Sequence, residues 1–295
     1  MPEPRVALLT REYPPDVYGG AGVHVEYLAR ELARLVDVTV HAWGDVRRAT
    51  PPGGPAVVSY RPWDALAGPE AFRAALEALS IDLAVAAGTG GANLVHSHTW
   101  YANLAGHLAG LCHGIPHVAT VHSLEPMRPW KAEQLGGGYA VSSFAERTGL
   151  EGADAVIAVS AGMRSDLLRC YPAIEPEPVC VIHNGIDTDE YRPDSGTGAL
   201  EHYGIDPQRP TVVFVGRITR QKGLGHLLEA DHLVGVACGQ LGKLRHVRDA
   251  RGVAGVDQPV ADAGRAQKES PQLGFGELAA ALPILLRLGM FRQSE

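Results

Sequence analysis

The sequence predicts a doubly wound α/β protein built around a parallel β-sheet. Apolar segments typical of buried strands alternate with helix-forming segments up to about residue 182. A glycine-rich loop and two groups of histidines each follow a predicted strand directly, which is where parallel sheets bind ligands. We expect a complete Rossmann-like domain over residues 1–192, a linker over 193–210 and an incomplete second domain over 211–295.

The elements of the first domain follow from local patterns. The first strand is predicted over Arg5–Thr10, an almost uninterrupted apolar run that suits a strand buried on both faces. Apolar residues then recur at helical spacing over 25–35, and Ser160 is expected to cap the last helix of the domain. Further strands are predicted over 36–41, 57–60, 94–96, 117–121, 155–159 and 179–182, and further helices over 69–80, 102–112 and 162–170.

The composition indicates a globular protein with a substantial core and no general affinity for nucleic acid. Hydrophobic residues make up 45% of the chain, and the net charge of −7 leaves no basic excess to meet phosphates. The four cysteines, Cys112, Cys170, Cys180 and Cys238, contain no C-x-x-C pair and are expected to be reduced thiols. Because neither a signal core nor a membrane-spanning run is present, we expect a cytoplasmic protein that does not bind membranes.

Three glycines lie in the loop that joins the first predicted strand to its helix: Gly19, Gly20 and Gly22. Backbone without side chains lets a phosphate or a sugar approach closely, and the N–H groups at the start of a helix can point at an anion. A tight turn without a ligand would use the same residues. A lone glycine-rich loop does not decide between these two interpretations.

Histidines end two successive strands of the predicted sheet. His96 and His98 lie at the end of one strand, and His122 ends the next. Because parallel strands present their carboxyl ends at one edge, we expect these side chains to converge on one cleft. Trp100 follows closely, and aromatic faces hold sugar rings through apolar contacts. The alternative is that each histidine is only hydrogen-bonded within its loop. No histidine pair spaced i, i+4 beside a carboxylate suggests a metal.

A basic corner is predicted near residue 216. An apolar strand over 211–215 runs into a glycine and then Arg217, and Lys222 and Gly223 follow as a helix opens. A helix N-terminus and an arginine fork together suit a phosphate or a diphosphate. The cations could instead be solvated charges at the surface. Two cations and a glycine at one corner favour anion binding.

Several segments in a fixed order carry a family resemblance: YPPDVYGGAG, VHSHTWYANLAGHLA, TVHSLEPMRPWKAEQLGGGY, ADAVIAVSAGMRSDLL, VIHNGIDTDEYRP and FVGRITRQKGL. They resemble retaining glycosyltransferases of the glycogen and starch synthase type, most closely the actinobacterial branch, over residues 5 to about 229. The resemblance implies two Rossmann-like domains facing across a cleft, the GT-B arrangement. It also implies ADP-glucose or a related nucleotide sugar as the donor, an α-1,4-glucan or glucose 1-phosphate as the acceptor, and a place in glycogen biosynthesis. The sequence itself gives no sign of a bound metal or a cofactor, and we expect none.

The resemblance also implies a donor site. The glycines of the first loop, Gly19, Gly20 and Gly22, would lie near the phosphates and the glucose of the donor. The diphosphate clamp would consist of Arg217 and Lys222, which would act catalytically by stabilising the charge on the leaving group.

The acceptor side of the family would correspond to His98, Thr99 and Trp100, and His122 would be the catalytic cleft histidine that supports the transferred sugar. Two positions depart from the starch synthase pattern. Val17 stands where relatives often have lysine, and Thr99 stands where they often have aspartate. These departures favour a branch whose donor and acceptor preferences differ from those of bacterial glycogen synthases.

The tail from residue 231 does not continue the pattern, because it is rich in glycine and shows little strand or helix periodicity. The family's donor domain ends with an E-x-F-G-x-x-x-x-E element. Glu269 and Glu277 have its spacing but not its Phe-Gly offset, so they are not assigned to it. We therefore expect a second domain that is truncated or frame-shifted after about residue 230 and poorly packed.

The sequence alone does not decide between three functions. The first is a glucosyltransferase that uses ADP-glucose. The second is a catalytically inactive remnant that keeps only acceptor-side or glucan binding, and the third is a transferase of the same fold that uses a UDP-sugar. The expected partners are a nucleotide sugar and a glucan or sugar-phosphate acceptor.

Overall fold

The structure is a computed structural model that describes residues 3–45, 54–66, 70–132, 137–208, 212, 214 and 222–230. The chain forms two compact units, with a boundary between Glu190 and Tyr191. The predicted domain boundaries at 192 and 210 stay predictions. Arg217 and the tail over 231–295 lie outside the described residues.

The described part of the first unit contains one seven-stranded parallel sheet with the order β3-β2-β1-β4-β5-β6-β7. The strand order reverses between β1 and β4, which creates the switch point at which open α/β sheets bind ligands. The strands are β1 (Arg5–Thr10), β2 (Asp37–Trp43), β3 (Ala56–Tyr60), β4 (Leu94–His98), β5 (His117–Val121), β6 (Ala155–Ala158) and β7 (Val179–Val181).

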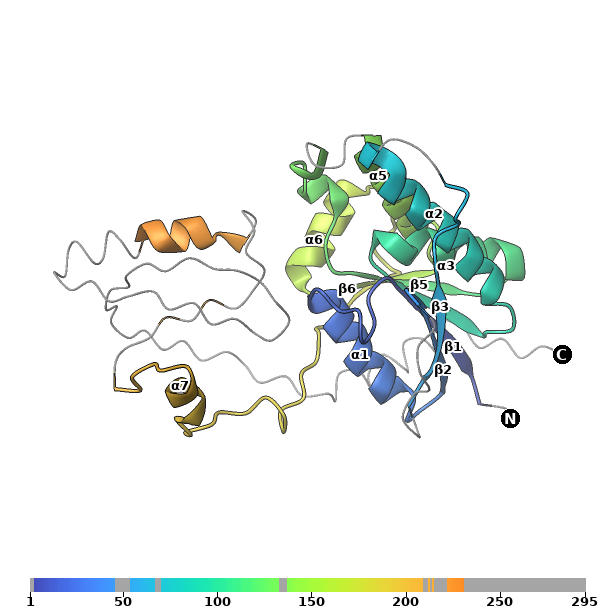
Figure 1. The fold of residues 1–295 in the computed structure, drawn as a ribbon. Coiled ribbons are helices and arrows are strands. Elements are labelled where there is room, and N and C mark those ends of the chain that lie inside the picture. The colour runs from blue at the N-terminus through green and yellow to red at the C-terminus, as the bar shows by residue number, and fades with distance from the viewer. Residues whose placement is uncertain are drawn as a thin grey trace. The chain divides into compact units, whose positions relative to one another are not determined.

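Helices cover both faces of this sheet (Figure 1). Leu8 of β1 packs with Val25 and Leu28 of α1 on one face, and Leu9 packs with residues of α2 and α3 on the other. Burying each such side chain contributes about 1.5–3 kcal/mol. The helices of this unit are α1 (Gly20–Leu32), α2 (Glu70–Gly88), α3 (Trp100–His113), α5 (Gly137–Glu151) and α6 (Ala161–Cys170), with the short 3₁₀ helix η1 (Glu125–Met127).

Most predicted elements of the first unit are confirmed, and two differ. The helix α2 continues eight residues beyond its predicted end, and this extension buries Ile81 and Val85 in the core. The Ser80 hydroxyl donates to the Glu77 carbonyl of the same helix and so does not end it. The predicted cap is present, since Ser160 Oγ accepts a hydrogen bond from the Met163 N–H. The helix α5 was not predicted, because three successive glycines over 136–138 suggest a loop rather than a helix start.

Glycines allow α3 to pack closely on its neighbours. A Cβ on Gly149 of α5 would lie 2.6 Å from the backbone of Asn103, and a Cβ on Gly106 would lie 2.2 Å from His117 Nε2. Both distances are shorter than real contacts, so a larger residue at either position would push α3 away from α5 or from β5. This close packing fixes α3 against the end of β4, where the candidate site lies.

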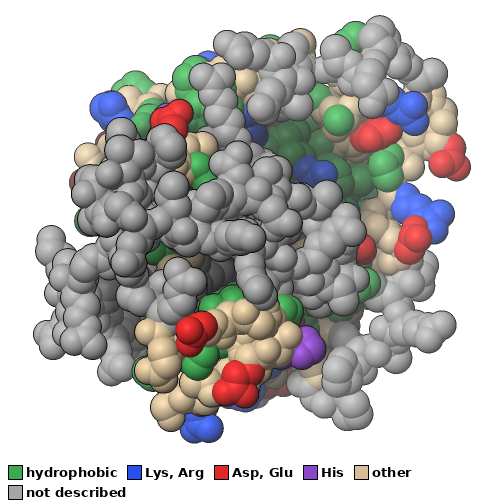
Figure 2. Space-filling view, turned by 60° about the vertical axis from the view of Figure 1, so that its left-hand side comes forward, with side chains coloured by type: hydrophobic (Ala, Val, Ile, Leu, Met, Phe, Trp, Pro, Cys, Tyr) green, Lys and Arg blue, Asp and Glu red, His purple; other side chains and the backbone are tan. Residues whose placement is uncertain are grey.

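The second unit is described only in part. It contains α7 (Gly198–His202) inside the predicted linker, and residues 224–230 form a helix. None of the described helices is long and apolar enough to cross a membrane. The three described cysteines are free. On the face shown in Figure 2, basic and acidic side chains of the described residues are interspersed.

Candidate active site at the carboxyl edge of the sheet

The candidate site lies at the carboxyl ends of β1, β4 and β5, beside the switch point of the sheet. The glycine loop follows β1, and the histidines end β4 and follow β5. An open pocket of about 810 Å³ lies at the opposite edge, among Arg5, Asp37 and Asn93 at the amino ends of the strands. We do not assign function to that pocket, because ligands of open parallel sheets bind outside the carboxyl ends.

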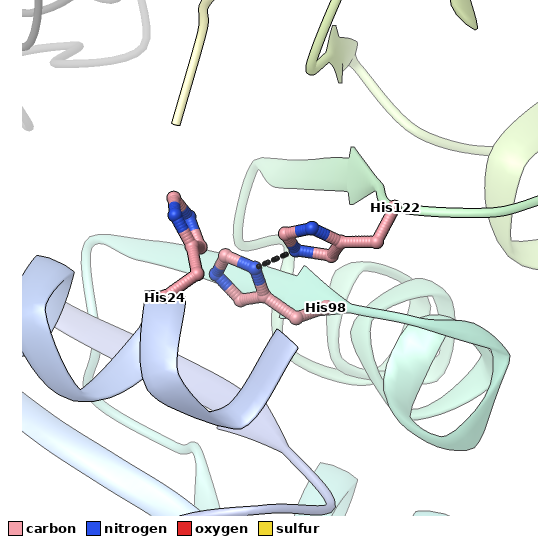
Figure 3. A group of neighbouring side chains, drawn as sticks. All are labelled: His24, His98 and His122. Atoms are coloured by element: carbon pink, nitrogen blue, oxygen red, sulfur yellow. Dashed lines mark hydrogen bonds between the residues drawn. The ribbon is translucent and has the colours of Figure 1, made fainter. Parts of the chain in front are cut away.

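Three histidines converge at this edge (Figure 3). His98 ends β4, His122 follows β5, and His24 reaches them from α1. Their ligand nitrogens lie within 4.8 Å of one another, and His98 Nδ1 lies 3.2 Å from His122 Nε2 in a hydrogen bond. The predicted convergence of the two strand ends is therefore found. The catalytic role of His122 and the acceptor role of His98 stay predictions.

All three histidines are neutral at pH 7. Burial lowers the pKa of His24 to about 4 and that of His122 to about 3, and it lowers the pKa of His98 well below 6.5. A neutral imidazole has one N–H donor and one nitrogen acceptor. These side chains can therefore hold sugar hydroxyls by hydrogen bonds, but they cannot supply positive charge to a phosphate.

The same three imidazoles form a donor set that suits Zn²⁺, which takes neutral histidine nitrogens in tetrahedral sites. The Nε2 atom of His98 is buried and has no hydrogen-bond partner in the structure. Sequence spacing could not reveal this arrangement, because His24, His98 and His122 come from three different elements. The prediction that the protein uses no metal stays a prediction.

A second layer of polar side chains fixes the end of β4. His96 Nε2 lies 2.7 Å from Thr120 Oγ1, and Ser97 Oγ lies 2.7 Å from His117 Nε2. The Ser97 hydroxyl also lies 3.0 Å from Asn103 Oδ1 on α3. These buried bonds join β4 to β5 and to α3, so they hold His98 in place.

The residue directly after His98 has an unusual backbone conformation. Thr99 adopts a positive φ of 67° directly before α3, a strained geometry that is frequent at functional sites. Trp100 is only 5% exposed and packs against Ala78, Ala145 and Tyr101. Its ring therefore belongs largely to the core in this structure. The predicted contacts of Thr99 and Trp100 with an acceptor stay predictions.

The backbone N–H groups of the glycine loop bind a carboxylate of the same chain, that of Glu12. The N–H groups of Tyr18 and Gly19 donate to Glu12 Oε2 at 3.0 and 2.8 Å. A Cβ on Gly22 would lie 2.7 Å from Glu12 Cβ, whereas Gly20 faces open space. Gly22 is therefore explained locally by Glu12, while the predicted contact of these three glycines with a donor stays a prediction.

Replacing Glu12 by alanine is expected to destabilise the protein by about 2 kcal/mol, because two N–H groups at the start of α1 lose a charged acceptor. Glu12→Gln keeps an oxygen acceptor without the charge and should cost about half as much. Urea denaturation at pH 7 measures both changes. Glu26→Gln on α1 removes the same charge from a carboxylate without these bonds and serves as the control. Equal stability of Glu12→Ala and the wild type would contradict the assigned role.

A buried polar group lies behind the loop that follows β5. Glu125 is fully buried and accepts hydrogen bonds from Lys131 at 2.6 Å and Ser142 at 2.8 Å. Burial raises the pKa of Glu146 to about 7, although hydrogen bonds from Tyr171 and from the Glu125 N–H oppose the shift. These contacts tie the loop after His122 to α5.

Sequence reasoning missed three residues of this edge: Arg11, Glu12 and His24. The first two directly follow β1, so their position at a carboxyl strand end was a usable signal. His24 lies in the first turns of α1, where only the packing of that helix shows that it faces His98.

The predicted basic corner belongs to the second unit. Lys222 is exposed, and Gly223 has a positive φ of 70°, a conformation that favours glycine, directly before the helix over 224–230. Arg217 lies outside the described residues. The diphosphate clamp formed by Arg217 and Lys222 therefore stays a prediction.

Comparison with known proteins identifies relatives. The chain is 56% identical over 231 residues to the alpha-maltose-1-phosphate synthase of Mycolicibacterium smegmatis and 55% identical to that of Mycobacterium tuberculosis. The alignments cover 77% of this chain and 57% of each relative, so the chain spans little more than half the length of these curated relatives.

Structural comparison supports the predicted fold. The sucrose-phosphate synthase of Thermosynechococcus elongatus matches with a TM-score of 0.62 at 20% identity, over 77% of this chain and 59% of that one. The α/β, GT-B-like fold class predicted from the sequence is thereby confirmed. Residues 18–190, which contain the glycine loop and the three histidines, match Glycosyltransferase Family 4. A match over more than half of the chain, with the fold in agreement, shows that the protein belongs to glycosyltransferase family 4.

Proposed function

We propose that the protein is a retaining glucosyltransferase that moves glucose from ADP-glucose to glucose 1-phosphate and so forms maltose 1-phosphate. The observation that carries the proposal is the 56% identity, over 231 residues, to a relative named alpha-maltose-1-phosphate synthase. Glucose 1-phosphate is the acceptor to which one glucosyl unit must be added to give that product. The departures at Val17 and Thr99 from the starch synthase pattern agree with an acceptor other than glucan.

The geometry of the described site supports a sugar-binding role. His98 and His122 have neutral imidazoles at the carboxyl edge of the sheet. A hydrogen bond between the two rings and buried hydrogen bonds between β4 and β5 hold these imidazoles in position. Sugars offer hydroxyl groups that both donate and accept, which neutral imidazoles match without repelling or attracting charge. In the proposal, His122 holds the transferred glucose and His98 supports His122.

The proposed reaction exchanges one C–O bond for another at the anomeric carbon of the donor glucose. The bond to the diphosphate breaks, and a bond to an acceptor hydroxyl forms on the same face, which retains the configuration. The hydroxyl proton passes to an oxygen of the departing diphosphate. Arg217 and Lys222 would stabilise the negative charge on that leaving group and would serve in place of a metal. In this proposal the domain over 1–192 binds the acceptor and the transferred glucose, and Arg217 and Lys222 bind the diphosphate of the donor.

Direct product analysis tests the proposal. The purified chain is incubated with ADP-glucose labelled in the glucose and with glucose 1-phosphate, and the products are separated by ion exchange. The expected result is labelled maltose 1-phosphate, with little product when UDP-glucose replaces ADP-glucose. Elongation of a glucan primer without maltose 1-phosphate would overturn the assigned acceptor.

A different outcome would favour the second candidate function. The second candidate is binding without transfer, because the tail from residue 231 shows no E-x-F-G-x-x-x-x-E element of the family's donor domain. Saturable binding of glucose 1-phosphate without release of ADP would indicate an acceptor-binding protein rather than a transferase.

A further inference from the structure

An arginine at the candidate site contacts aromatic rings through its guanidinium group instead of forming ion pairs with carboxylates. Arg11 directly follows β1, and its guanidinium carbon lies 4.2 Å from the ring centre of Tyr101, 5.1 Å from that of Trp43 and 5.5 Å from that of Tyr18. Among the described residues, no carboxylate forms an ion pair with Arg11. Its Nε atom is buried and has no hydrogen-bond partner. A half-buried guanidinium in this state retains unused donors for an anion.

A second arginine acts electrostatically on Tyr101. Arg128 follows η1, donates from Nη1 to Ser123 Oγ at 3.2 Å, and also has a buried Nε atom without a partner. Burial raises the pKa of Tyr101, while the charges of Arg11 and Arg128 lower it and that of Glu125 raises it. The charges of both guanidinium groups therefore act on the same tyrosine, and that of Arg11 does so from a distance of 4.2 Å.

The nearby carboxylates are already engaged with other groups. Glu12 accepts the N–H groups of Tyr18 and Gly19, and Glu125 accepts Lys131 at 2.6 Å while Arg128 lies 3.6 Å from it. Glu125 can therefore neutralise only part of the charge of Arg128 and Lys131. Arg11 therefore keeps unused hydrogen-bonding capacity at this edge of the described sheet.

We propose that Arg11, with Arg128 as a second cation, binds the phosphate group of an anionic sugar acceptor at the carboxyl edge of the sheet. An arginine fork matches two phosphate oxygens at once, and the aromatic rings of Tyr101 and Trp43 fix its orientation before the ligand arrives. This inference rests on the proposed function for the identity of the sugar phosphate. It assigns the specificity for a phosphorylated acceptor to residues outside the histidine cluster.

The position of Arg11 explains how the carboxyl edge of the sheet can bind both the hydroxyl groups and the phosphate group of one ligand. The three histidines are neutral and suit hydroxyls, whereas Arg11 and Arg128 are charged and suit phosphate. Arg11 follows β1 and Tyr101 lies in the first turn of α3 after β4, so the cation lies at the switch point of the sheet. A sugar phosphate could therefore place its ring and its phosphate on different side chains of the same edge.

Calorimetric titration of the full chain tests the inference with three probes: inorganic phosphate, glucose 1-phosphate and glucose. We expect Arg11→Gln to weaken binding of glucose 1-phosphate by about 10- to 100-fold, since hydrogen bonds to a charged group are lost. Binding of glucose should change little. The matched control is Arg34→Gln, which removes the same charge from an exposed arginine paired with Glu31.

Arg11→Lys keeps the charge and much of the aromatic contact but lacks the fork, so it should bind glucose 1-phosphate with intermediate affinity. This variant keeps the test decisive if Arg11→Gln does not fold, which thermal unfolding would show. Unchanged affinity for glucose 1-phosphate in both variants would overturn the inference and leave the proposed acceptor intact. Failure of the wild type to bind either phosphate or glucose 1-phosphate would also overturn it.

The proposed function can fail separately. If phosphate binds in an Arg11-dependent manner but the chain forms no maltose 1-phosphate from ADP-glucose and glucose 1-phosphate, the anion site stands and the assigned reaction does not.

Discussion

Replacing His122 by alanine is expected to reduce glucosyl transfer by about 100- to 1,000-fold, the loss seen when one preorganised hydrogen-bonding group is removed from a catalytic site. The imidazole is held by His98 at 3.2 Å, and burial keeps it neutral by lowering its pKa to about 3. The substitution removes a preorganised partner of the transferred sugar. The effect should fall mainly on kcat, because the proposed contact strengthens as the sugar leaves its diphosphate.

Two further variants separate this role from a structural one. His122→Gln keeps a side chain that can bond to both His98 and a hydroxyl, so it should recover part of the lost rate. His202→Ala removes an exposed histidine of α7 and should leave the rate unchanged. Initial rates of ADP release with glucose 1-phosphate as acceptor measure all three variants. Wild-type rates in His122→Ala, with an unchanged melting temperature, would exclude a catalytic contact by this residue.

Acidification below pH 6.5 is expected to destabilise the first unit strongly. Burial is the main cause of lowered pKa values in six histidines of the described residues: about 4 for His24 and His41, about 3 for His96, His117 and His122, and well below 6.5 for His98. Between pH 6.5 and these values the unfolded chain binds protons that the folded chain does not. The free energy of unfolding therefore decreases as the pH decreases, by about 2 kcal/mol at pH 5 for each histidine whose pKa is about 3 or about 4.

Two buried carboxyl groups act in the opposite direction. Burial raises the pKa of Glu146 to about 7 and that of Asp82 well above its ordinary value. These groups stay protonated in the folded protein at pH values where they are ionised in the unfolded chain. They therefore stabilise the fold as pH decreases and offset part of the loss. The histidines outnumber them, so we expect a net loss over the window from pH 6.5 to about 4.

Urea denaturation at pH 7 and pH 5, followed by circular dichroism and tryptophan fluorescence, measures this effect. His24→Gln removes one imidazole with a pKa of about 4 and should reduce the difference between the two pH values by about 2 kcal/mol. His226→Gln, which changes an exposed histidine of the second unit, is the control. A free energy of unfolding that is the same at both pH values would contradict the assigned neutral state of the buried histidines.

Much of the fold could be predicted because its signals are local. The strands β1 and β5 were predicted with the bounds that the structure has, since both are short apolar runs flanked by turn residues. The prediction was wrong where a local signal misled. Ser80 looked like a helix end but bonds to its own helix, and the glycines around the start of α5 concealed a helix that tertiary packing stabilises.

The candidate site was predictable in outline. That His98 and His122 meet follows from their places at the ends of two strands in one parallel sheet, because neighbouring carboxyl ends share an edge. His24 could not be assigned in this way, since its approach depends on how α1 rotates on the sheet. Likewise, the glycine pattern indicated a close approach of backbone at this loop but not that Glu12 would be the group approached.

The sequence alone determined the parallel α/β architecture, the edge that carries the polar residues and the resemblance to a glycosyltransferase family. Each of these depends on period, spacing or order along the chain. The tertiary structure alone decided that Glu12 closes the glycine loop, that His24 completes a histidine cluster and that aromatic rings hold Arg11. Those contacts join side chains from different elements, and their geometry is set by helix rotation, strand register and burial, which no local pattern encodes.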